Sequence, residues 1–115
     1  MIEIEVMFSS VPVSNFDAAV EWYGRLFGRD CDVVVHDTEV MWRLADAAWL
    51  YVIEDAERAG QTVVALSVSD LDQARSELTL RGIECGVVEI VGDGGRKSTI
   101  EDADGNLISF IQVNS

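Results

Sequence analysis

The first part of the chain changes its hydrophobic period twice. Residues 3–8 alternate between polar and apolar side chains, which predicts a strand. Residues 14–17 then offer polar side chains that can cap a helix, and Gly28 offers a natural end for it. Between these signals the apolar side chains recur at helical spacing, at Phe16, Ala19, Val20, Tyr23, Leu26 and Phe27. The pattern predicts a helix directly after the first strand.

Three short runs rich in β-branched and aromatic residues follow this helix. They cover residues 31–36, 40–44 and 49–53, and polar breaks separate them. Runs of this length and composition predict three strands in a meander. This part of the chain is therefore expected to fold as a strand, a helix and three strands, ending near Glu57.

The same order returns after a polar linker at residues 54–61. Residues 62–68 predict a strand, Ser69 is the expected cap of a helix over residues 70–80, and Gly82 can end that helix. Turns rich in Asp and Gly separate three further predicted strands, at residues 86–91, 97–101 and 107–113.

The two parts also match residue by residue, which indicates an internal repeat. Residues 13–16 align with residues 68–71, and residues 46–52 align with residues 104–110. A sheet covered by one helix leaves its other face bare, so two copies are expected to bury these faces against each other. The pairing can occur within one chain or between two chains.

We therefore expect one α+β domain of two tandem β-α-β-β-β modules, residues 1–57 and 58–115, whose curved mixed sheets surround a cleft. The length of 115 residues suits a single domain. Hydrophobic residues make up 49% of the chain and charged residues 25%, which is the balance of an ordered globular protein.

The duplicated order and its motifs resemble the vicinal oxygen chelate superfamily. That group contains glyoxalase I, extradiol dioxygenases, fosfomycin-resistance thiol transferases and bleomycin-resistance proteins. The motifs that carry the resemblance are residues 13–16, Trp22-Tyr23 before residues 26–28, and a turn at residues 101–108 with Ala103 where the family usually has proline. The resemblance covers essentially the whole chain and implies the glyoxalase/bleomycin-resistance/dioxygenase fold, but no single activity.

Enzymes of this superfamily hold a metal ion on the first and last strand of each module, usually with His, Glu or Gln. By the resemblance, these positions fall on Phe8, Tyr51, Val63 and Ser109. Phe and Val have no donor atom, and protonated Tyr and Ser are poor ligands for a divalent ion. We therefore expect no metal and no other cofactor, and hence no metal-dependent glyoxalase, dioxygenase or fosfomycin chemistry.

The same four positions are still expected to face the cleft, because strand alternation is unchanged. Leu50, Val52, Ile108 and Phe110 would then pack against the helices. With their neighbours, the predicted ligand-binding residues are Phe8, Trp42, Trp49, Tyr51, Val63, Leu107 and Ser109. An aromatic lining suits a flat or conjugated ligand. The alternative is that these side chains fill the core and leave no pocket.

Charge narrows the possible partners. The chain has 8 basic and 21 acidic residues, a net charge of −13, which repels nucleic acid and anionic membrane surfaces. No run approaches the roughly 18 apolar residues of a membrane span, and no signal peptide is recognisable, so the expected location is the cytoplasm. The acidic excess lies mainly in residues 1–57, where it either attracts a cationic compound or only solvates the surface.

These observations predict a metal-independent small-molecule binding protein that sequesters a drug-like or cationic aromatic compound, like the metal-free bleomycin-resistance branch that the chain resembles. Two alternatives stay open. One is a glyoxalase-type lyase or isomerase, or a dioxygenase-related enzyme, that works without a conventional metal. The other is an oligomeric scaffold with no ligand. A homodimer is expected, because a short duplicated sheet leaves edges and apolar faces for a partner to cover.

Overall fold

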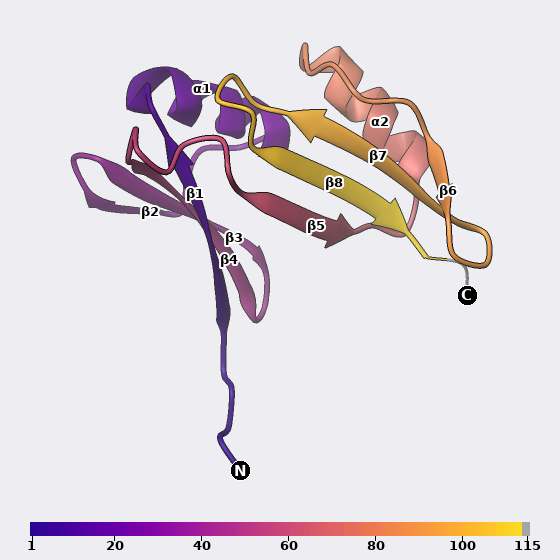
Figure 1. Ribbon diagram of the computed structural model, residues 1–115, viewed down its shortest axis with the longest axis horizontal. Helices are drawn as coiled ribbons and strands as arrows, with labels where there is room; N and C mark the ends of the chain where they lie inside the picture. Colours follow the sequence, from indigo (N-terminus) through magenta and orange to yellow (C-terminus); the bar gives the residue numbers. More distant parts are fainter. Residues whose placement is uncertain (114–115) are drawn as a thin grey trace.

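The computed structural model describes residues 1–113, which form two modules with the same order of elements (Figure 1). The first module contains β1 (Met7–Val13), α1 (Phe16–Phe27), β2 (Val33–His36), β3 (Glu39–Ala45) and β4 (Ala48–Glu54). The second contains β5 (Val63–Ser67), α2 (Leu71–Leu80), β6 (Glu89–Val91), β7 (Gly95–Glu101) and β8 (Leu107–Gln112). The predicted α+β fold of two tandem modules is confirmed.

Each module folds its strands into one mixed sheet, in the orders β1-β4-β3-β2 and β5-β8-β7-β6. The first and last strands of each module run parallel, and the other neighbours run antiparallel. In the parallel pairs, Phe8 lies opposite Trp49 and Val63 lies opposite Leu107. This register brings residues far apart in sequence to the same face of a sheet.

Both helices begin at a residue whose side chain caps them. The side chain of Asn15 accepts a hydrogen bond from the backbone N–H of Ala18, and Asp70 accepts one from Gln73. The expected cap at Ser69 is therefore wrong by one residue, and the helix begins at Leu71, because the extended backbone of Asp70 aims its carboxylate at the first turn. Neither helix in the described part of the chain is long and apolar enough to cross a membrane.

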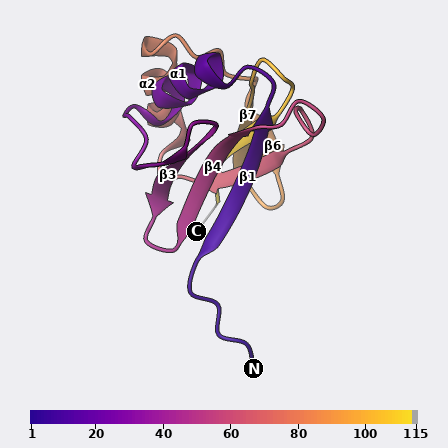
Figure 2. The same ribbon diagram turned by 90° about the vertical axis from the view of Figure 1, so that its left-hand side faces the viewer.

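The first strand begins later than the sequence pattern predicts. Its partner β4 begins at Ala48, opposite Met7, so residues 1–6 extend past the sheet as an arm (Figures 1 and 2). The strand instead continues to Val13 through Pro12, which β1 accommodates because it lies at the edge of its sheet. Strands β2 and β6 are likewise shorter than the apolar runs that predicted them.

The two helices cover the same side of the two sheets, and the opposite side stays open (Figure 1). Leu50, Val52 and Ile108 lie on the helix side and are fully buried, as alternation predicts. The core between sheets and helices also contains Val11, Val13, Tyr23, Leu26, Trp42, Leu78 and Ile100. On the open side, Phe8 is 53% exposed and Val63 is 74% exposed. The modules of one chain therefore do not bury their open faces against each other.

A buried asparagine at the turn between β7 and β8 joins the two modules. The side-chain amide of Asn106 donates to the carbonyl of Pro12 on β1, at 2.9 Å, and to the Asp102 carboxylate, at 2.8 Å. Its oxygen accepts hydrogen bonds from the backbone N–H groups of Gly60 and Thr62, at 3.1 and 3.0 Å. One fully buried side chain thus links β1, the linker between the modules and the turn.

Asp102 connects the same cluster to α1. Its carboxylate accepts a hydrogen bond from the Tyr23 hydroxyl at 2.7 Å, and further ones from the backbone N–H groups of Asp104 and Asn106, at 3.0 and 2.9 Å. Burial, with the neighbouring Asp102 charge, raises the pKa of Tyr23 well above its ordinary value of 10.0. The phenol therefore keeps its proton and remains a donor to Asp102.

Two arginines link the ends of the helices reciprocally. Arg81 donates to the carbonyls of Arg25 and Leu26, at 2.6 and 3.1 Å, while Arg25 donates to those of Arg81 and Gly82, both at 3.4 Å. Each cation lies where the partner helix presents its last carbonyl groups, which is the favourable end of a helix for positive charge. The internal repeat thus produces a symmetric contact between the modules.

Replacing Asn106 with alanine is expected to lower the free energy of unfolding by roughly 2–4 kcal/mol, because Asp102 and two partly buried N–H groups each lose a hydrogen-bond partner. Denaturant unfolding followed by Trp fluorescence measures this loss. Asn15→Ala removes only an exposed helix cap, should cost about 1 kcal/mol, and serves as the control. Equal losses in the two variants would contradict the linking role of Asn106.

Candidate ligand-binding site

The open face of the first sheet carries a group of aromatic side chains. Phe8 on β1 and Trp49 on β4 lie opposite each other, with their ring centroids 6.4 Å apart. Tyr51 follows two residues later on β4 and lies opposite Ser10 and Met41 of the neighbouring strands. The sequence predicted these three aromatic residues together, and the structure places them on one face.

A hollow of about 610 Å³ lies beside Phe8 and Trp49. Its other walls come from β2, β3 and the arm before β1, through Val33, Met41 and residues 3–6. The volume lies within the usual range of small-molecule pockets. The arm brings the carboxylates of Glu3 and Glu5 to the edge of an otherwise apolar surface, and neither forms an ion pair within residues 1–113.

The remaining predicted residues lie on the open face of the second sheet, apart from Trp42. Val63 on β5 is largely exposed and lies opposite Leu107 on β8. Ser109, two residues further along β8, is only 6% exposed, and its hydroxyl lies 2.8 Å from the hydroxyl of Thr99. This face therefore mixes apolar side chains with polar and charged ones, because Thr99 lies opposite Ser109 and Glu101 lies opposite Leu107.

Trp42 does not line the open face, so the prediction that it joins Trp49 and Tyr51 in the cleft is wrong for its position. Its side chain is fully buried on the helix side, with ring centroids 5.6 Å from Phe27 and 6.4 Å from Tyr23. The indole N–H donates to the carbonyl of Arg29 at 3.0 Å. The register explains the difference, because Trp42 lies opposite the core residue Leu50 and not opposite Trp49.

The predicted residues thus form two groups, one on each sheet. Phe8, Trp49 and Tyr51 belong to the first module, whereas Val63, Leu107 and Ser109 belong to the second. Within one chain, the hollow at the first group is lined only by its own module and its arm. One chain therefore does not enclose both groups in a single cleft. Such a cleft would need another protein surface to cover the open face of each sheet.

Sequence reasoning missed the contribution of the arm. The alternation in residues 3–8 is the available signal, and by itself it predicts a strand inside the sheet. Because the chain before β1 extends past the first residue of its partner β4, Glu3 and Glu5 instead lie at the edge of the hollow. Met41 was also missed, since the pairing of β3 with β4 places it opposite Tyr51.

The side chains at the four positions where the resemblance implies metal ligands are poor donors for a divalent ion. Phe8 and Val63 are hydrocarbons, and the Ser109 hydroxyl is shared with Thr99. In the described part of the chain, no group of three or more His, Cys, Asp or Glu side chains converges where it could hold a metal. What these four positions offer a ligand is mainly contact area from Phe8, Tyr51 and Val63.

Comparison with known proteins identifies the class of protein to which this two-module fold belongs. The model of the Glyoxalase/Bleomycin resistance protein/Dioxygenase superfamily matches residues 5–110. The chain belongs to this superfamily. A crystal structure of a glyoxalase / bleomycin resistance protein from Catenulispora acidiphila DSM 44928 is 38% identical, with a TM-score of 0.89, over 95% of this chain and 98% of that one.

More distant structures share the fold. A bleomycin-binding protein complexed with bleomycin is 20% identical, with a TM-score of 0.77, over 94% of this chain and 98% of that one. An antibiotic-binding protein from Streptomyces sp. CB03234 is 24% identical, with a TM-score of 0.77, over 99% of each chain. A lactoylglutathione lyase from Agrobacterium tumefaciens is 17% identical, with a TM-score of 0.76, over 93% of this chain and 92% of that one. Comparison with curated proteins found no match.

Purified protein is expected to contain less than about one tenth of an equivalent of divalent metal, because the donor set is too poor to hold an ion. Elemental analysis after incubation with Zn²⁺, Ni²⁺ and Mn²⁺ followed by desalting measures this content. EDTA should leave the midpoint of thermal unfolding unchanged, since no metal contributes to folding. A stoichiometric ion whose removal lowers that midpoint would overturn the expectation.

Proposed function

We propose that this protein binds a cationic aromatic small molecule on the open face of its first sheet, without a metal and without changing it chemically. The observation that carries the proposal is the hollow in which Phe8 and Trp49 form an accessible aromatic wall and Glu3 and Glu5 provide acidic groups. A flat cation can stack on the rings while its charge faces the carboxylates.

Electrostatics favours such a ligand over a neutral or anionic one. The two carboxylates of the arm have no ion-pair partner among the residues described, and the whole chain carries a net charge of −13. A field of this sign attracts cations to the site and repels anions, most strongly at low salt. The same field speeds the encounter between the protein and a cationic compound.

The comparisons support a binding role. Structures with the same fold include a protein complexed with bleomycin and a protein described as antibiotic-binding. A fold alone does not determine activity, so the argument for this chain rests on the residues of its own hollow. Sequestering a drug-like compound would need only contact and burial, which the open face can provide.

We further propose that a second copy of the chain completes the site. The open faces leave large apolar side chains exposed, among them Phe8 and Val63, and Ile4 of the arm is exposed as well. Around a twofold axis, the first module of each copy can face the second module of its partner, which forms two equal clefts. Each cleft would then combine the two groups that one chain keeps apart.

The cytoplasmic location stays a prediction.

Titration with proflavine, a planar cationic dye, is expected to quench Trp fluorescence and to saturate. Trp49→Leu should weaken binding roughly tenfold, because it removes one stacking surface. The double variant Glu3→Gln and Glu5→Gln should weaken it roughly threefold to tenfold in low salt, and should flatten the salt dependence.

The matched control for the charge change is the double variant Glu77→Gln and Glu84→Gln, which removes two exposed carboxylates from the second module. Its affinity for proflavine should stay within about twofold of the unmodified protein at equal ionic strength. If both double variants lose affinity equally, the dye responds to net charge rather than to the hollow beside Phe8 and Trp49. That result would contradict the proposed site.

Sedimentation velocity should show a dimer at micromolar protein concentration. Val63→Glu is expected to shift the equilibrium towards monomer, because it places a charge on the apolar open face. Val63 is exposed within one chain, so the substitution should leave monomer folding intact. Leu80→Glu, an equally exposed change on α2, is the control and should remain dimeric. A monomeric unmodified protein, or a dimeric Val63→Glu variant, would count against this arrangement.

A further inference from the structure

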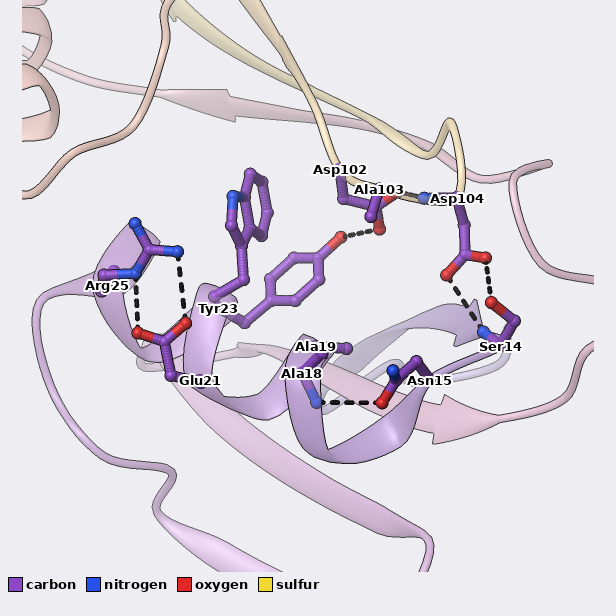
Figure 3. A pocket seen from close by; sticks show the side chains of 11 residues that line it. Ser14, Asn15, Ala18, Ala19, Glu21, Tyr23, Arg25, Asp102, Ala103 and Asp104 are labelled. Atoms are coloured by element: carbon purple, nitrogen blue, oxygen red, sulfur yellow. Dashed lines mark hydrogen bonds and ion pairs between the residues drawn. The ribbon is translucent and has the colours of Figure 1, made fainter.

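A second hollow lies on the helix side of the molecule, between α1 and the turn that joins β7 to β8 (Figure 3). Its volume is about 410 Å³. Ala18, Ala19 and Trp22 form the wall along α1, and Ala103 lies on the turn opposite, between Asp102 and Asp104. None of these residues belongs to the open face of the sheets, so the hollow is separate from the site of the proposed function.

The walls of this hollow are apolar and firmly positioned. The three alanines present only methyl groups. Trp22 is partly buried, and its ring meets that of Tyr23 edge to face, with centroids 4.8 Å apart. Tyr23 is in turn held by its hydrogen bond to the buried Asp102. An aromatic wall fixed in this way can receive an apolar or cationic group without first becoming ordered.

Two of the charged groups around the hollow form an ion pair with each other, whereas two others are bound only by neutral donors among the residues described. The guanidinium of Arg25 is bound to the carboxylate of Glu21 at 2.8 Å, and these two charges cancel (Figure 3). Asp104 accepts hydrogen bonds from the backbone N–H and hydroxyl of Ser14, at 3.0 and 2.5 Å. Asp102 is likewise bound only by neutral donors. Within residues 1–113, therefore, neither aspartate has a cationic partner.

We propose that this hollow is a second ligand site, which takes a compact ammonium ion with an apolar body. The body would contact the methyl groups of Ala18 and Ala19 and the face of Trp22, and the cationic head would lie towards Asp104. Attraction between a cation and an indole ring, reinforced by a nearby carboxylate, is the interaction that this combination offers. An anion would meet two uncompensated aspartates and is disfavoured.

The three tryptophans of the chain allow a direct test, because each lies in a different environment. Trp22 lines this hollow, Trp49 lines the open face, and Trp42 is buried in the core. In a ¹H–¹⁵N correlation spectrum of the whole protein, titration with benzyltrimethylammonium chloride should shift the indole N–H signal of Trp22 in a saturable manner. The signal of Trp42 should stay in place and serves as the internal control.

The charge and shape of the probe are tested with matched molecules. Benzoate and benzyl alcohol should leave the Trp22 signal unmoved at the concentration that half-saturates the cation. A response of Trp22 to all three probes would overturn the proposal, because it would indicate an unselective apolar surface. No response to the cation would also overturn it. The Trp49 signal reports independently on the open face, so failure here is distinguishable from failure of the proposed function.

Two variants locate the binding. Ala18→Leu should fill the hollow and abolish the Trp22 response, and leucine is well tolerated in a helix. Ser76→Leu, an equally exposed change on α2, is the matched control and should bind like the unmodified protein. Trp22→Leu, followed through the backbone amides of Ala19 and Ala103, should weaken binding roughly threefold to tenfold, because it removes the cation–indole attraction. Unchanged affinity in both Ala18→Leu and Trp22→Leu would place the ion elsewhere.

Discussion

The structure depends on one constraint, which is that the buried Asp102 and Asn106 must have all their hydrogen-bonding groups paired. Their partners come from β1, from α1, from the linker and from their own turn. A buried carboxylate without these donors would be strongly unfavourable, so the cluster can form only when both modules are in place. The buried cluster thus acts together with the reciprocal arginine contacts to make one unit of two similar modules.

This way of joining the modules has a consequence for binding. The buried cluster and the arginine contacts join the modules so that both helices lie on one side. The other side of both sheets therefore faces away from the core (Figure 1). Strand alternation then separates the side chains into two sets. Leu50 and Trp42 fill the core, while Trp49 and Phe8 remain accessible. The face that the core does not use is therefore the face on which the proposed ligand and the proposed second copy would bind.

The chemistry of that face suits the proposed binding role. Positions that hold metal ligands in related enzymes carry Phe8 and Val63, which provide contact area and no donor atoms. The arm adds Glu3 and Glu5 to the edge of the hollow, where their charge would attract the proposed cationic ligand. The second hollow, beside Trp22, combines the same two elements, an aromatic wall and uncompensated carboxylates, on the opposite side of the molecule.

The sequence by itself determined the features that depend on neighbouring residues. The helix over 16–27 with its glycine end, the repeated order of elements and the inward face of Leu50 and Val52 all follow from local periodicity and capping. The features that depend on pairing between distant segments were decided only by the tertiary structure. The start of β1 depends on where β4 begins, and the side taken by Trp42 depends on its register with Leu50. The arrangement of the modules depends on contacts of Asn106 with Gly60 and Pro12, 46 and 94 residues away along the chain, which no local pattern encodes.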